Sequence, residues 1–338
     1  MKAVQIEAFG GPEVLEVVEV PVPEPGPGQI QLRVEAAAVN FADVMRRRDD
    51  AYPFPTELPF RPGAEVAGTV ERLGAGVEGP PVGSSVFAVV GGDGSTGYAQ
   101  FAVADAAQVV PIPPGLGAAE AAGITVAGTT AMLVLTDRAR LAEGESVLVG
   151  GAGGGVGTLA VQIAKVLGAG TVVGAASTGA KREAALAAGA DAVVDPTVSG
   201  WESEAAAAIG GAGFDVVLEV AGGRTFAEGL SVLAPFGRFV VLGRASGSAG
   251  VFDESAQHRF LYVPSPNQTI TVFNLGVYFG LRPQVAIEAM TEVIGLVASG
   301  RVRIPVDEVL PLDRAAEAHR RLEERESTGK LVLDPWAA

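Results

Sequence analysis

The sequence predicts an α/β protein with two domains, one rich in β-strands and one built on a doubly wound parallel sheet. The chain has 338 residues, more than a single core usually holds. Residues 29–35 alternate between polar and apolar, as in a half-buried antiparallel strand. From about Gly123, valine-rich runs alternate with alanine-rich segments, which is typical of βα units.

The β-rich domain is predicted over residues 1–122 and, at the other end of the chain, 269–338. Its first part is predicted to hold strands at residues 14–20, 29–35, 66–72 and 85–90. The tail is predicted to complete this domain with a strand from residue 269, helices near 283–299 and 313–324, and a last strand at 330–333.

The parallel-sheet domain is predicted over residues 123–268. Its strands are predicted near residues 146–150, 171–176, 192–195, 214–219 and 238–243. Helices are predicted between them, near residues 155–167, 180–188, 201–209 and 225–233. The regular alternation predicts that the strands lie parallel, with a helix after each.

Charge and composition argue against some kinds of partner and some kinds of reaction. The formal net charge of −15 disfavours nucleic acid and an anionic membrane surface as partners. The absence of cysteine excludes disulfides, thiol nucleophiles and thiolate-bound zinc. The chain opens on an alternating strand that carries Glu7, and its uncharged stretches at residues 121–136 and 146–164 are rich in Gly and Thr. We therefore expect a cytoplasmic protein without a membrane span.

A glycine-rich loop at residues 150–157 follows a predicted strand and precedes a predicted helix. Backbone N–H groups at such a helix start bind a pyrophosphate, and glycine lets the phosphates approach because it has no Cβ. The loop therefore predicts a Rossmann dinucleotide site, with a merely glycine-rich turn as the alternative. The residues expected at the pyrophosphate are Gly154, Gly155, Val156 and Gly157.

The end of the next strand indicates which dinucleotide binds. An NAD site places an acidic residue there for the ribose 2′-hydroxyl, but this chain has Ser177 and no acid between Thr158 and Arg182. Lys181 and Arg182 follow, and two cations beside a hydroxyl suit a 2′-phosphate. The sequence therefore favours NADP(H), with a solvated helix start as the alternative.

Over nearly its full length the chain resembles the medium-chain dehydrogenase/reductase superfamily, in particular its zinc-free quinone oxidoreductase (zeta-crystallin-like) branch. The matching segments are residues 1–4, 40–43, 62–68, 128–131, the glycine loop, 315–323 and 329–330. Phe273, Asn274 and Leu275 are similar to the vesicle amine transport protein subgroup of that branch.

The resemblance implies a GroES-like β domain formed by both chain ends, a Rossmann domain between them, and a homodimer. Zinc alcohol dehydrogenases of the superfamily have a histidine where this chain has Ala64, so the resemblance implies no metal. The implied residues beside the nicotinamide are Asn40 and Thr130. The other implied cofactor contacts are Ser177, Lys181, Gly243, Arg244, Phe273, Asn274, Leu275 and Lys330.

Two positions depart from the family pattern. Met45 and Pro196 stand where relatives often have tyrosine, which removes a phenol from the substrate side and a contact from the adenosine phosphate. Tyr52 and Tyr278 are candidates to replace the phenol.

Without a metal or a thiol, reduction must rely on the placement of the nicotinamide hydride against a carbon already made electrophilic. The sequence therefore predicts an NADPH-dependent reductase of quinones or α,β-unsaturated carbonyl compounds. The alternatives are a dedicated biosynthetic enoyl reductase and a non-catalytic NADPH-binding protein of the vesicle type.

Several polar residues have structural interpretations beside their functional ones. Asn40 is an N-cap, a pocket residue or both, and Asp43 is expected to be structural. Arg46, Arg47 and Arg48, followed by two aspartates, are expected to form a solvated charged face. His319 lies in an amphipathic helix and is expected to be structural, whereas His258 lies in a polar loop.

Overall fold

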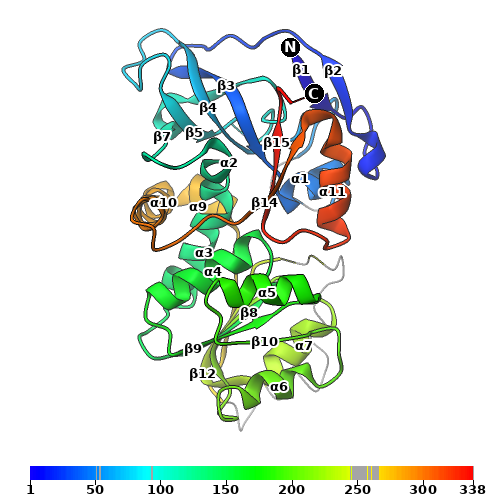
Figure 1. The fold of residues 1–338 in the computed structure, drawn as a ribbon, viewed down its shortest axis with the longest axis vertical. Helices are drawn as coiled ribbons and strands as arrows, with labels where there is room; N and C mark the ends of the chain where they lie inside the picture. The colour runs from blue at the N-terminus through cyan, green and yellow to red at the C-terminus, as the bar shows by residue number, and fades with distance from the viewer. Residues whose placement is uncertain are drawn as a thin grey trace. The chain divides into compact units, whose positions relative to one another are not determined.

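A computed structural model describes residues 1–50, 52, 55–92, 94–243, 245, 257, 260 and 266–337 of the chain. These residues form two compact units (Figure 1). The first comprises Met1–Val126 and Ile304–Ala338, and the second comprises Ala127–Arg303. The predicted α/β class with a β domain and a Rossmann domain is confirmed.

The first unit is built on a seven-stranded sheet. Its strands run in the order β14-β15-β3-β4-β5-β7, and β6 pairs with β3. Their bounds are β3 (Gln29–Ala38), β4 (Glu65–Leu73), β5 (Ser85–Val89), β6 (Phe101–Asp105), β7 (Val110–Pro111), β14 (Val306–Pro311) and β15 (Lys330–Asp334). A separate hairpin holds β1 (Lys2–Gln5) and β2 (Glu16–Glu19), and the helices are α1 (Phe41–Arg47), α2 (Ala118–Ala121) and α11 (Ala315–Glu323).

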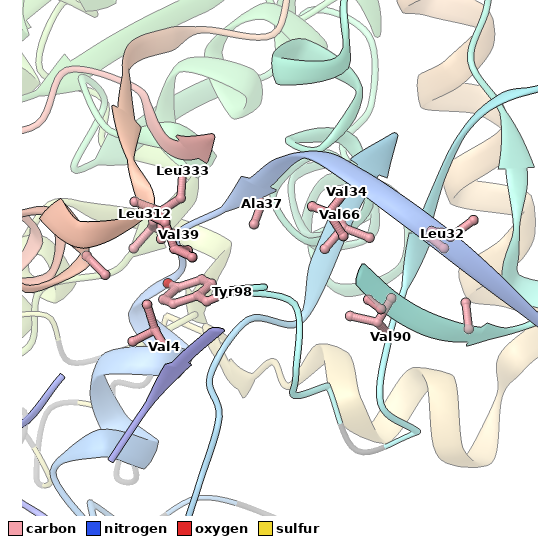
Figure 2. Close-up of a cluster of buried hydrophobic side chains, with 14 of the residues drawn as sticks. Val4, Leu32, Val34, Ala37, Val39, Val66, Val90, Tyr98, Leu312 and Leu333 are labelled. Carbon is pink, nitrogen blue, oxygen red and sulfur yellow. The ribbon is translucent and has the colours of Figure 1, made fainter. Parts of the chain in front are cut away.

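The core of this unit comes from both chain ends, as Figure 2 shows. Ile30, Leu32 and Val34 of β3 are fully buried, which confirms the predicted apolar face. Gln31, expected on the polar face, is buried as well, because its side-chain amide donates to the carbonyl of Pro23. Leu333 of β15 joins the same cluster, since β15 pairs with β3.

The second unit holds a six-stranded sheet in which every pair of neighbours is parallel. Its order, β10-β9-β8-β11-β12-β13, is the 3-2-1-4-5-6 order of the Rossmann fold. The strands are β8 (Ser146–Gly150), β9 (Thr171–Ala175), β10 (Ala192–Val194), β11 (Phe214–Glu219), β12 (Leu233–Val241) and β13 (Thr269–Val272). The helices are α3 (Thr129–Leu133), α4 (Gly155–Val166), α5 (Gly179–Ala187), α6 (Trp201–Ala207), α7 (Arg224–Ser231), α9 (Leu275–Leu281) and α10 (Pro283–Ala298).

The assignment of residues 269–303 to the β-rich domain was wrong. Strand β13 pairs in parallel with β12 and supplies the sixth strand of the Rossmann sheet. Helix α10 packs on α3 so closely that a Cβ on Gly128 would lie 2.8 Å from Val293. The chain returns to the first unit only at Ile304, and the other boundary falls at Val126, against the predicted residue 122.

One helical stretch, Ala118–Arg138, is long and apolar enough to cross a membrane. It contains α2, α3 and two π-helical turns, Ile124–Gly128 and Val134–Arg138. Because 72% of its most apolar window is buried inside the protein, it has the character of a core helix. Thr130 lies inside this stretch, in α3.

Candidate functional site

The glycine loop lies between β8 and α4, at the carboxyl edge of the sheet beside the β8–β11 switch point. Gly154 is the N-cap of α4, and the first i→i−4 bond of the helix runs from the Thr158 N–H to the Gly154 carbonyl at 2.9 Å. The N–H groups of Gly155, Val156 and Gly157 therefore precede the helical ladder. Such groups at a helix N-terminus fit a pyrophosphate.

The loop tolerates only glycine at three of its positions. A Cβ on Gly157 would lie 2.1 Å from the carbonyl oxygen of Gly151, and Gly151 itself has a φ of +61°. A Cβ on Gly153 would lie 2.6 Å from both Cβ and the carbonyl oxygen of Lys181. The loop is thus a cradle that side chains would fill, and it packs directly against the first turn of α5.

This packing brings Lys181, one of the two predicted phosphate residues, to the cradle. Ser177 is half-buried just after β9, and the Thr178 hydroxyl caps α5 by accepting the N–H of Lys181 at 3.3 Å. Lys181 therefore lies in the first turn of α5, beside the glycine loop. The positive helix end and a lysine both favour an anion here.

The second predicted cation has another role. Arg182 donates to the carbonyl of Ala176 at 3.0 Å and to the carboxylate of Asp195 at 2.8 Å. The hydrogen bond from the Thr197 hydroxyl, together with Arg182, lowers the pKa of Asp195. Asp195 follows β10, the strand beside β9, and its carboxylate neutralises Arg182.

The remaining cofactor residues predicted in this unit are widely distributed. Gly243 is exposed shortly after β12, and Thr130 is half-buried in α3. Phe273 is buried against Tyr278, with ring centroids 5.3 Å apart. Asn274 and Leu275 form the N-cap and first residue of α9, and the Asn274 side chain accepts the N–H of Val277. Arg244 and His258 lie outside the described residues.

In the first unit, Asn40 belongs to a buried polar cluster with Glu65 and Lys330. The Lys330 ammonium lies 2.6 Å from Oδ1 of Asn40 and 3.0 Å from Oε1 of Glu65. The Asn40 amide nitrogen donates to the same Glu65 oxygen at 3.0 Å. Asn40 stands at the N-cap position of α1, but its side chain turns to this cluster, and the Asp43 carboxylate accepts the Asn40 N–H instead.

Sequence reasoning missed Glu65, although an acid inside the apolar segment Ala64–Ala67 was a usable signal. Glu65 is 1% exposed, and its second oxygen accepts the N–H of Val126 at 2.7 Å. A buried carboxylate needs such partners. The cluster thus joins β4, β15 and the residue before α1.

The prediction of a solvated face for Arg46 and Arg47 was wrong. Arg46 is 2% exposed and its guanidinium lies over the rings of Tyr52 and Phe60, while Arg47 is fully buried. Neither guanidinium is unpaired: Arg46 donates to Thr56, and Arg47 to Glu323 at 2.7 Å. Partners from elsewhere in the chain make this burial possible, which local charge patterning does not reveal.

A buried hydrogen-bond chain confirms the structural interpretation of His319 and Asp43. Arg47 lies 3.4 Å from Nδ1 of His319, whose Nε2 lies 3.1 Å from the hydroxyl of Tyr98. That hydroxyl donates to Asp43 at 3.2 Å, and the Tyr98 ring lies between Val4 and Val39 (Figure 2). Burial, reinforced by Arg47, lowers the pKa of His319 to about 3, whereas burial raises the pKa of Asp43 to about 6.

The two tyrosine candidates differ in their surroundings. Tyr278 is buried and donates its hydroxyl to Asp137, and this burial and hydrogen bond raise its pKa to about 12. Because the Tyr278 hydroxyl already donates to a carboxylate and its pKa is raised, it is a poor proton donor to a substrate. Tyr52 is half-buried with Arg46 5.4 Å from its ring.

Among the described residues, no group of three His, Cys, Asp or Glu side chains is placed to hold a metal ion. Across the whole chain there is no cysteine. The charged groups beside Asn40 are the ammonium of Lys330 and the carboxylate of Glu65, and their charges neutralise each other.

Family models match both parts of the chain. Residues 26–114 match the alcohol dehydrogenase GroES-like domain, and residues 188–333 match the zinc-binding dehydrogenase model.

Three kinds of curated relative are similar to the chain. A quinone oxidoreductase of Pseudomonas aeruginosa is 33% identical over 339 residues, covering 99% of each protein. A phenolphthiocerol/phthiocerol polyketide synthase protein of Mycobacterium tuberculosis is 34% identical over 97% of the chain, but the chain spans only 14% of that synthase protein. A zebrafish (Danio rerio) homolog of synaptic vesicle membrane protein VAT-1 is 30% identical over 89% of the chain and 63% of its own length.

Two solved structures combine this fold with NADPH. Escherichia coli quinone oxidoreductase complexed with NADPH aligns with a TM-score of 0.89 at 29% identity, covering 99% of this chain and all of that one. A mycobacterial protein complexed with NADPH aligns with a TM-score of 0.88 at 32% identity over the same shares. With the glycine cradle and the family models, these likenesses show that the chain belongs to the medium-chain dehydrogenase/reductase superfamily, with the quinone oxidoreductases as relatives.

Proposed function

We propose that the protein is a zinc-independent reductase that transfers a hydride from NADPH to a quinone or an α,β-unsaturated carbonyl compound. The observation that carries the proposal is the cradle of the second unit, where Lys181 packs against the glycine loop and Ser177 stands in place of an acid. NADPH, when bound, supplies the hydride.

The acceptor class follows from the residues available to polarise a carbonyl. An unactivated ketone needs a Lewis acid or a strong proton donor to stabilise the developing alkoxide. The chain lacks cysteine, has Ala64 at the position of a zinc histidine in relatives, and commits Tyr278 to Asp137. A conjugated acceptor spreads the charge itself, so correct placement is sufficient.

We assign the site residues in three groups. Gly154, Gly155, Val156 and Gly157 bind the pyrophosphate, and Ser177 and Lys181 bind the 2′-phosphate. Asn40 and Thr130 position the nicotinamide, which Gly243, Arg244 and residues 273–275 adjoin. Tyr52 is the candidate on the substrate side. Lys330, whose ammonium donates to Asn40, is assigned to the cofactor as well.

Turnover tests this proposal. With NADPH, we expect oxidation of the cofactor by several simple quinones and alkenals, no reduction of an unactivated ketone such as cyclohexanone, and rates unchanged after dialysis against a chelator. Reduction of cyclohexanone that a chelator abolishes would contradict it. The assay follows NADPH absorbance, with acceptor-free protein as the control.

Two other functions predict different outcomes in the same assay. The likeness to a segment of a polyketide synthase favours a dedicated enoyl reductase, which would ignore simple quinones and reduce an enoyl thioester. The likeness to the vesicle protein favours an NADPH-binding protein without turnover, which would bind the nucleotide and consume none with any acceptor.

The cofactor preference rests on Ser177 and Lys181. We expect the natural chain to prefer NADPH over NADH by on the order of 1–3 kcal/mol, because the 2′-phosphate gains charge-assisted hydrogen bonds. Ser177→Asp and Lys181→Ala should each erode this preference, measured by titration with both nucleotides. Lys165→Ala is the matched control, since Lys165 pairs with Asp191 on the surface of the same unit. An unaltered preference in both variants would show that the phosphate binds elsewhere.

We also propose a cytoplasmic homodimer with a small-molecule substrate and no nucleic-acid or membrane partner. Strand β13 ends the order of the six-stranded sheet and leaves Val272 71% exposed. An apolar edge strand of this kind suits pairing with a second copy.

A further inference from the structure

Glu219, the last residue of β11, is a buried carboxylate at the carboxyl edge of the Rossmann sheet. It is 4% exposed, and β11 pairs with β8, the strand that leads into the glycine loop. Removing a carboxylate from water is costly unless hydrogen bonds replace the lost hydration. Burial accordingly raises the pKa of Glu219, and within the part of the chain that the structure describes no cation pairs with it. The compensation comes from neutral donors instead.

These donors belong to the turn that follows β11 and to the start of α7. The N–H groups of Ala221 and Gly222 donate to Oε1 of Glu219, both at 2.7 Å, and the Thr225 hydroxyl lies 3.1 Å from the same oxygen. Successive backbone N–H groups that converge in this way form a nest for an anion. Here the chain's own carboxylate fills the nest, so Glu219 holds the turn that follows its strand.

The turn has little else to fix its conformation. Gly222 and Gly223 have φ values of +73° and +61°, which glycine adopts readily and other residues rarely do. Gly223 is the N-cap of α7 and has no side chain to cap the helix. Two adjacent glycines permit this turn but also permit many others. The restraint from Glu219 therefore selects the observed conformation.

The same turn packs against the glycine loop. A Cβ on Gly151 would lie 2.6 Å from Cγ2 of Val220, the first residue after β11. The Gly151 carbonyl in turn accepts the N–H of Gly154, the N-cap of α4, at 2.9 Å. A displacement of Val220 would thus be passed through Gly151 to the start of α4, where the free N–H groups lie.

We propose that Glu219 is a positioning residue of the nucleotide cradle, which holds the turn 220–223 against the glycine loop so that the first turn of α4 keeps the shape that receives a pyrophosphate. The proposal rests on the function above, in which the glycine loop binds the pyrophosphate of NADPH. Glu219 acts through the turn and needs no contact with the nucleotide.

Two variants of similar side-chain size test this role. Glu219→Gln keeps an oxygen acceptor for the donors of the turn, whereas Glu219→Met removes it. We expect Glu219→Gln to bind NADPH about as tightly as the natural chain. Glu219→Met should bind it about 10-fold or more weakly, the worth of one hydrogen bond to a charged phosphate. Calorimetric titration with NADPH measures both affinities.

A second ligand separates the pyrophosphate from the rest of the nucleotide. Adenosine 2′-monophosphate carries the 2′-phosphate but no pyrophosphate, so its affinity should be unchanged in both variants. General damage to the unit would instead weaken the binding of both ligands. Asp215→Leu is the matched control, because Asp215 lies near the other end of β11 and accepts the N–H and the hydroxyl of Ser146, both at 2.8 Å. It should lower stability and leave NADPH affinity unchanged.

Each outcome decides between the positioning role and its alternatives. Natural affinity for NADPH in Glu219→Met would overturn the role, and so would a loss that Glu219→Gln, adenosine 2′-monophosphate or Asp215→Leu shares; the NADP(H) function would stand in all these cases. If Glu219→Met does not fold, Glu219→Asp replaces it. Its carboxylate is one methylene shorter and should weaken NADPH binding, and an unchanged affinity there would equally overturn the role. Failure of the natural chain to bind NADPH at all would overturn the proposed function itself.

Discussion

Replacing Gly157 by alanine is expected to weaken NADPH binding by about 100-fold or more, because each lost hydrogen bond to a charged phosphate costs about 1.5–3 kcal/mol. The new Cβ would lie 2.1 Å from the Gly151 carbonyl oxygen, so the loop must move away from α4. The N–H groups of the first helical turn would then no longer converge on a pyrophosphate. Calorimetric titration with NADPH measures the loss.

A glycine in another helix of the same unit provides the control. Gly295 lies in α10, and a Cβ there would meet no atom within 4 Å. Gly295→Ala should leave NADPH affinity unchanged and raise stability by about 0.5–1 kcal/mol, as expected for an exposed helical position. Unchanged affinity in Gly157→Ala would mean that the cofactor phosphates do not bind at this loop.

Replacing His319 by glutamine is expected to change how the stability of the first unit depends on pH. In the folded protein the pKa of His319 is lowered to about 3, and in the unfolded chain it returns to about 6.5. Between these values the unfolded state binds the extra proton, so His319 costs stability as the pH falls. Relative to the variant, the natural protein should lose about 1.4 kcal/mol per pH unit below pH 6, or about 3 kcal/mol at pH 4.

Asp43 opposes this effect in the natural protein. Its folded pKa of about 6 exceeds the ordinary value of 3.8, so acidification through this range stabilises the folded state. In the natural protein, the opposite effects of His319 and Asp43 on the free energy of unfolding nearly cancel between pH 4 and 6. In the glutamine variant only the effect of Asp43 should remain. Glutamine can still donate to Tyr98 and accept from Arg47, so the packing is largely kept.

The two tryptophans make the measurement specific. Trp336 lies in the first unit and Trp201 in the second, so Trp201→Phe leaves a single reporter of the unit that holds His319. Urea unfolding of this background, with and without His319→Gln, is followed by Trp336 fluorescence from pH 4 to 7. If the free energy of unfolding changed with pH in the same way with and without His319→Gln, His319 would not remain neutral in the folded protein.

Some of the site could be predicted because its chemistry is local in the chain. The glycine loop, its strand and its helix fall within about one βα unit, where spacing alone places the N–H groups at the helix start. Ser177 and Lys181 follow the next strand at the distance that a Rossmann fold requires. The β domain was recognised in the same way, from alternation within single strands such as residues 29–35.

The errors share a physical cause, which is that the decisive partner lies far along the chain. Arg47 was predicted to be solvated because its partner, Glu323, lies 276 residues later in the chain. Arg182 looked available until the end of β10 brought Asp195 to it. Strand β13 was assigned to the wrong domain because a short apolar run does not reveal which sheet it joins.

By itself, the sequence determined the fold class, the nucleotide cradle and the absence of cysteine chemistry, since periodicity, glycine spacing and composition are properties of neighbouring residues. Only the tertiary structure decided that Glu65 and Lys330, 265 residues apart, meet at Asn40. Burial and pairing depend on which surfaces come together when the sheets assemble, and a charged side chain is stable in the core only if its partner arrives there as well.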